Sequence, residues 1–184
     1  MVPFVTSALV AACTLLLAFP LASCKAKHQL EHETMVDAFK ALAISPYGVA
    51  LYDIDKDGDL DCLAATRTEF SVDPPRATYI LAFKGANGHI TNFTYHLRQG
   101  PTPDTNVVVI NNDNDHPLTN HYLYSDYKNC IVLEFPILNH QECVLWVTRA
   151  ATENTPQICI DQFQDNCDDG TLTYDKDTCA DMVL

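Results

Sequence analysis

Short stretches of alternating apolar and polar residues fill most of this chain, and helical spacing is confined to two places. Residues 30–43 carry apolar side chains at helical spacing, and Ser45-Pro46 ends that run. The pattern then predicts strands separated by turn-forming pairs, at residues 47–54, 60–70, 76–84, 89–98, 105–111, 121–125, 130–135 and 143–149. Residues 155–167, with Pro156 near their start, predict a short helix against the outside of the sheet. Eight short strands in succession indicate an all-β fold, a barrel or a sandwich.

Two predicted strands, 130–135 and 143–149, each carry a cysteine and show which side chains face inward. If the cysteines face outward, the side chains between them turn inward. The inward residues are Ile131, Leu133 and Phe135 on the first strand, and Val144 and Trp146 on the second. An eight-stranded barrel has room for one small ligand, so these residues either line a cavity or fill a dry core. Periodicity is compatible with both.

The first 24 residues contain no charged side chain and include an apolar run that ends at Pro20, followed by small residues. This pattern predicts a secretory signal peptide at residues 1–24 and one exported domain at residues 25–184, with no membrane span. The segment Leu21-Ala22-Ser23-Cys24 also resembles a bacterial lipoprotein signal, but the leader lacks the Lys or Arg expected near its start.

Six cysteines follow the leader, namely Cys62, Cys130, Cys143, Cys159, Cys167 and Cys179. An even number in an exported domain predicts three disulfides, although spacing alone does not choose their pairing. With all six cysteines committed, and without a phosphate loop or a nucleophile elbow, the chain is not expected to be an enzyme or to need a cofactor.

The net charge of −13 lies entirely on residues after the leader. It argues against nucleic acid as a partner. The acidic surface either keeps an exported protein soluble, the reading we favour, or steers a cationic ligand toward it.

An acidic run at Asp53, Asp55, Asp57, Asp59 and Asp61, with Gly58 inside it, matches the core of a calcium loop. Ala64 stands where an EF-hand places its bidentate Glu, and the run joins two strands rather than two helices. We therefore favour an Asp-rich hairpin loop, with a calcium loop or an amine-binding loop as the alternatives. Asn92-Phe93-Thr94 is the one N-glycosylation sequon.

Four segments resemble the tick salivary lipocalins, the histamine-binding family. Residues 37–42 (DAFKAL) resemble the family's N-terminal helix, and residues 124–130 (YSDYKNC) resemble the approach to its signature strand. Leu145-Trp146 and residues 156–159 (PQIC) complete the likeness. The resemblance implies an eight-stranded antiparallel lipocalin barrel, with a short N-terminal helix and a C-terminal helix packed outside. It also implies the disulfides Cys130–Cys159 and Cys62–Cys179, which leaves Cys143 to pair with Cys167.

The resemblance further implies a monomeric scavenger, secreted in saliva, that sequesters a small host inflammatory mediator. Amine-binding members carry acids where this chain has Ile131 and Val144, and burying a cation without a paired charge is costly. A lipid mediator or fatty acid is therefore favoured over histamine or serotonin. The expected ligand-binding residues are Phe39, Tyr79, Phe83, Ile131, Leu133, Val144 and Trp146, with Arg76 and Arg98 as candidates for a ligand carboxylate. The alternatives are amine binding as in the family, or surface binding of a host complement or haemostasis protein.

Overall fold

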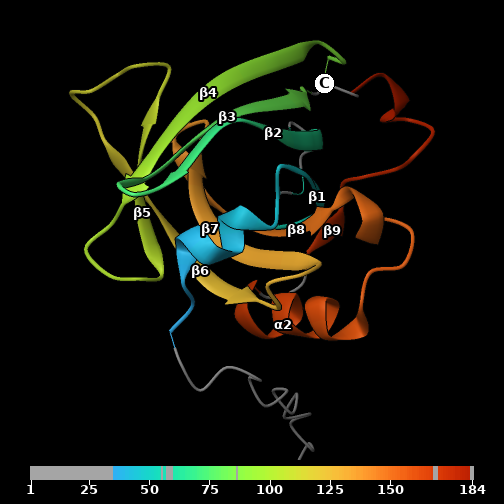
Figure 1. Ribbon diagram of the computed structural model, residues 1–184. Coiled ribbons are helices and arrows are strands. Elements are labelled where there is room, and N and C mark those ends of the chain that lie inside the picture. Colours follow the sequence, from blue (N-terminus) through green and yellow to red (C-terminus); the bar gives the residue numbers. More distant parts are fainter. Residues whose placement is uncertain (1–34, 55, 57–59, 86, 168–169, 183–184) are drawn as a thin grey trace, which may run out of the picture.

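The computed structural model describes residues 35–54, 56, 60–85, 87–167 and 170–182 (Figure 1). Eight antiparallel strands close into a barrel, because β1 pairs with both β8 and β2. The strands are β1 (Tyr47–Asp53), β2 (Asp61–Val72), β3 (Pro75–Lys84), β4 (Ile90–Gln99), β5 (Thr105–Ile110), β6 (Leu118–Ser125), β7 (Cys130–Ile137) and β8 (His140–Thr148). The predicted eight-stranded antiparallel barrel is thus confirmed. The predicted signal peptide lies outside the described residues.

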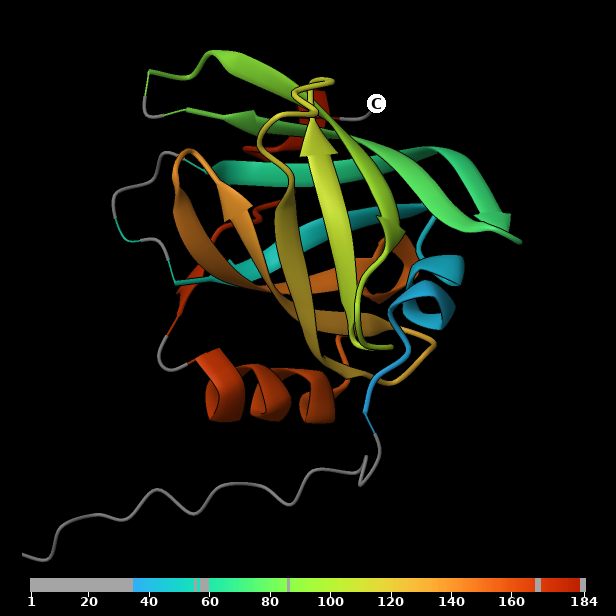
Figure 2. The same ribbon diagram turned by 90° about the vertical axis from the view of Figure 1, so that its left-hand side faces the viewer.

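Two helices and three short elements complete the described chain. They are α1 (Ala38–Ala43), η1 (Arg149–Ala151), α2 (Gln157–Cys167), β9 (Thr171–Leu172) and η2 (Ala180–Met182). Figure 2 shows α2 running along the outside of the barrel, as predicted. None of the described helices is long and apolar enough to cross a membrane.

The sheet buries both of its faces where α2 covers it. Ile131, Leu133 and Phe135 belong to the cluster of apolar side chains inside the barrel, which confirms the predicted alternation along β7. On the outer face Val132 packs in a second cluster with Phe163 of α2. The disulfides Cys130–Cys159 and Cys143–Cys167 fasten α2 to β7 and β8.

Helix α1 covers one end of the barrel. Its first turn is bonded to the β4–β5 loop, and its last turn is bonded to β2. Asp37 caps its first turn, accepting from the N–H of Lys40 at 2.9 Å, and the N–H of Ala38 donates to Pro103 O at 2.8 Å. At the other end Arg67 of β2 donates to Leu42 O at 2.7 Å. These contacts place the buried face of α1 over the barrel interior.

The seam between β1 and β2 has only short direct pairing. Their pairing is limited to the first three residues of β1, Tyr47 to Val49. Beyond it, a C-terminal strap, residues 171–180, fills the gap between the strands. Thr173 donates its N–H to Leu51 O of β1 and accepts from the N–H of Cys62 of β2, both at 3.1 Å. The disulfide Cys62–Cys179, a pair that the resemblance implied, fastens the strap across the seam.

Candidate ligand-binding site

A cavity of about 60 Å³ lies between α1 and the middle of the barrel. Its aliphatic lining is Leu42, Ala65, Leu81, Leu97, Ile131 and Leu133; its aromatic lining is Tyr79, Tyr95, Tyr122, Phe135 and Trp146; and Ser45 and Asn120 add polar groups. None of these lining residues carries a formal charge.

Four of the seven residues expected to bind a ligand line this cavity, namely Tyr79, Ile131, Leu133 and Trp146. The other three are buried in the same interior cluster but outside the lining. Phe39 lies on α1 with its ring 6.5 Å from that of Phe70, and Phe83 lies 5.8 Å from Phe93. Val144 is completely buried.

Hydroxyl groups of the lining tyrosines are mostly engaged with the protein. Tyr79 donates to Ser45 O at 2.8 Å, and Tyr122 accepts from Asn106 Nδ2 at 2.7 Å. Burial raises the pKa of Tyr79 to about 12, and it also raises the pKa of Tyr122, so both phenols are neutral at physiological pH. The lining is therefore uncharged as well as largely apolar.

Two polar atoms of the lining have no hydrogen-bond partner among the described residues. They are the indole N–H of Trp146, a donor, and Oδ1 of Asn120, an acceptor, and both are buried. Buried polar groups normally find a partner, so these two can orient a ligand that supplies one acceptor and one donor. The sequence identified Trp146 through its inward position, but not Asn120.

Acidic side chains do face the barrel interior, although at positions that the sequence did not indicate. Asp53 of β1 is fully buried and lies opposite Val144 in the β1–β8 register. Glu142, 5% exposed, is two residues from Val144 on the same face of β8, and its Oε1 lies 3.0 Å from His140 Nε2. Neither carboxylate is part of the cavity lining.

The basic residues suggested for a ligand carboxylate do not reach this cavity. Arg76 and Arg98 are exposed and face each other across β3 and β4, while their neighbours Ala77 and Leu97 face inward. That prediction is therefore wrong. The cation beside the cavity is Arg67, whose guanidinium is held by the carbonyl oxygens of Leu42 and Ala43.

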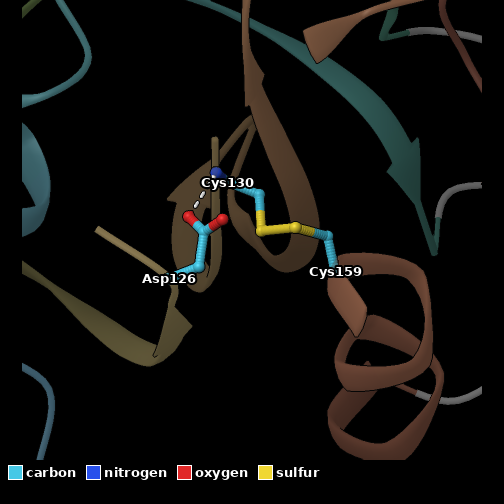
Figure 3. A group of neighbouring side chains, drawn as sticks. All are labelled: Asp126, Cys130 and Cys159. Carbon is cyan, nitrogen blue, oxygen red and sulfur yellow. Dashed lines mark hydrogen bonds between the residues drawn. A yellow bond between two sulfur atoms is a disulfide. The ribbon is translucent and has the colours of Figure 1, made fainter. Parts of the chain in front are cut away.

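Most of the candidate calcium loop lies outside the described residues, namely Asp55, Asp57 and Asp59. Asp53 is buried on the inner face of β1, whereas Asp61 is exposed at the start of β2. Within the described part of the chain, the one group with metal-ligand spacing is Asp126, Cys130 and Cys159 (Figure 3). Both of its cysteines are joined in a disulfide, so they offer no thiolate to a metal.

The Asp126 carboxylate organises the turn that leads into β7 instead. Its Oδ1 accepts from the backbone N–H groups of Lys128, Asn129 and Cys130 at 2.7–3.0 Å, the last of which is drawn in Figure 3. Partial burial raises the pKa of this carboxyl, but the hydrogen bonds from Asn129 and Cys130 outweigh it and leave the pKa below its usual range.

Asp126→Ala is expected to lower the free energy of unfolding at neutral pH by about 2–3 kcal/mol, because three N–H groups lose a charged acceptor. A depressed carboxyl pKa contributes stability above the unfolded pKa of about 4 and loses it as the pH falls through the folded value. Urea denaturation at pH 7 and pH 3 measures both effects. The exposed Asp115→Ala is the matched control, and equal behaviour of the two variants would contradict the role given to Asp126.

The sequon lies on the outside of the barrel wall. Asn92 is exposed, whereas the neighbouring Phe93 packs against the interior cluster. The side chain that would carry a glycan is thus accessible.

A small cavity inside a closed antiparallel barrel with an external C-terminal helix defines a lipocalin-like ligand-binding protein. The tick histamine-binding protein model matches residues 34–181, and the chain belongs to this family. Family and fold are those of ligand-binding proteins rather than enzymes. A search of curated proteins finds no significant match.

Three solved structures illustrate the shared fold. Japanin from Rhipicephalus appendiculatus, bound to cholesterol, is 13% identical over 73% of this chain and 97% of its own, with a TM-score of 0.52. AM182 in complex with serotonin is 17% identical over 80% of this chain and 95% of its own, with a TM-score of 0.55. Lobster apocrustacyanin A1 is 9% identical over 73% and 80% of the two chains, with a TM-score of 0.53.

Proposed function

We propose that the protein is a secreted salivary scavenger that sequesters a small lipid mediator or fatty acid in its barrel. The observation that carries this proposal is the uncharged lining of the inner cavity, in which aliphatic and aromatic side chains predominate. Ile131, at the position of an acid in amine-binding relatives, contributes directly to that lining. Apolar ligand surface gains free energy on leaving water at such a wall, at roughly 25 cal/mol per Å².

The same lining disfavours a cationic amine in this cavity. An ammonium group taken out of water needs a paired charge and hydrogen bonds, and an unpaired one costs several kcal/mol. The carboxylates of Asp53 and Glu142 lie outside the lining, and Glu142 is within ion-pair distance of His140.

Amine binding is the second candidate, and those two carboxylates are the specific observation that favours it. Asp53 and Glu142 are buried, face inward and stand on adjacent strands, so an amine seated between the inner cavity and the β7–β8 turn would meet negative charge. Of the solved relatives, AM182 was crystallised with serotonin and Japanin with cholesterol, which fits a family fold able to hold either class of ligand.

Secretion and action as a monomer complete the proposal. Three disulfides suit an oxidising, extracellular compartment, and the family is one of tick proteins. The mediator would then be captured at the feeding site, outside the cell that made the protein.

Trp146 is the only tryptophan in the chain and lines the cavity, so its fluorescence reports on occupancy. Titration with oleate is expected to change the emission both in the parent and in Glu142→Gln. Histamine is expected to leave both unchanged. A histamine response in the parent that disappears in Glu142→Gln would favour the amine candidate instead.

A further inference from the structure

A second hollow of about 680 Å³ opens at the end of the barrel opposite α1. We call it the mouth hollow; its apolar wall includes Phe93, Ile110, Leu118 and Ile137, and His140 and Gln141 stand at its rim. It is an order of magnitude larger than the inner cavity of about 60 Å³. The barrel therefore contains a small inner space and a large outer one.

Tyr95 of β4 lines both spaces and Phe135 of β7 lines the inner one, so together they form a partition between them. Their ring centroids are 6.4 Å apart, and Phe135 stands edge-on to Trp146 at 6.0 Å. The Tyr95 hydroxyl donates to Pro136 O at 2.9 Å, and this bond holds the Tyr95 ring against the backbone of β7. Both partition residues are only 2% exposed.

The partition limits what the inner cavity can hold. Ligand pockets in proteins commonly measure about 300–1,000 Å³, and a cavity that holds one water molecule measures ~10–15 Å³. The inner cavity is thus large enough for a few waters or a very small ligand, but not for a long acyl chain. Such a chain fits only if the inner cavity and the mouth hollow become one space.

We propose that Tyr95 and Phe135 set the ligand length that the barrel accepts. A long-chain lipid displaces the Phe135 ring, lies through the barrel from Ile131 to the mouth hollow, and leaves its polar end beside Gln141 and His140. This inference rests on the proposed function, and it adds the specificity-determining residues and the class of ligand, a single-chain amphiphile with its head at the mouth.

Removing the Phe135 ring should therefore favour long chains selectively. Phe135→Ala is expected to bind hexadecanoate at least about tenfold more tightly than the parent, the effect of two further buried methylenes, with a smaller gain for dodecanoate and least for octanoate. Tyr95→Phe keeps the ring but loses the bond to Pro136 O, and hexadecanoate is expected to associate with this variant faster than with the parent.

Phe163→Ala is the matched control for Phe135→Ala. Phe163 is equally buried, but it lies outside the barrel, on the face of α2 that packs against the sheet. Calorimetry at a temperature where every variant is folded gives the affinities.

Acrylamide quenching of Trp146 tests the partition without any ligand. Because Phe135 stands between Trp146 and the mouth, quenching should rise in Phe135→Ala and stay at the parent level in Phe163→Ala. Equal quenching in the two variants would overturn the partition, and a gain in affinity that is the same for all three chain lengths would overturn the length selection. If no fatty acid binds any variant while quenching still rises in Phe135→Ala, the lipid ligand fails, and with it the length selection, but the partition stands.

Discussion

Ile131→Asp is expected to abolish fatty-acid binding and to lower the free energy of unfolding at pH 7 by about 3 kcal/mol or more. Ile131 is 3% exposed and lines the inner cavity, where no lining residue could pair with a new carboxylate. An ionised group there loses its hydration, and it places a charge against the apolar end of the ligand. Urea denaturation and calorimetry with oleate measure the two losses.

The matched control is Ile131→Asn, which has nearly the same shape as the Asp variant and no charge. It should bind oleate more weakly than the parent but measurably, and its stability should lie between those of the other two proteins. The penalty in Ile131→Asp should shrink as the pH falls and the new carboxyl takes up a proton. Unchanged oleate binding in Ile131→Asp would show that ligands do not contact this wall of the barrel.

Joint replacement of Cys62 and Cys179 by Ser is expected to cause the second large loss of stability. This disulfide spans a sequence separation of 117, and the chain-entropy model assigns such a loop about 4–5 kcal/mol. It also holds the C-terminal strap between β1 and β2, where the barrel has little direct pairing. We therefore expect a lower free energy of unfolding, together with faster hydrogen exchange at the backbone amides of Thr173 and of position 62.

The control pair is Cys143→Ser with Cys167→Ser, which removes a disulfide of separation 24 on the outer face of the barrel. The free energy of unfolding of this control is expected to fall by about 3 kcal/mol, while hydrogen exchange stays slow along the seam between β1 and β2. If both double variants lose the same stability and exchange alike at the seam, the strap does not close the barrel.

The strand pattern predicted the all-β class and most strand positions, because alternation is a short-range property of the sequence, whereas the closed barrel and the disulfide pairing were implied by the family resemblance. Alternation on β7 placed Ile131 and Leu133 inside, and the structure agrees. The disulfides join the three pairs that the family resemblance implied. Partition contacts such as Tyr95 to Pro136 join residues 41 positions apart, and no local pattern predicts them.

The inward acid on β1 was missed for a specific physical reason. The β1–β8 register shifts between Ala50 and Tyr52, so Leu51 and Tyr52 both pack on the outer face. The bulge returns Asp53 to the inner face, which regular alternation from Ala50 would not do. Glu142, by contrast, follows regular alternation from Val144, so its inward position is predictable from the sequence.

We expect the barrel of this protein to select an apolar ligand over an amine. Parallel calorimetric titrations of the refolded protein with oleate and histamine test this selectivity. We predict saturable binding of oleate at about one ligand per chain, with the negative heat-capacity change that accompanies apolar burial, and no measurable heat with histamine. Tight binding of histamine without binding of oleate would contradict this expectation.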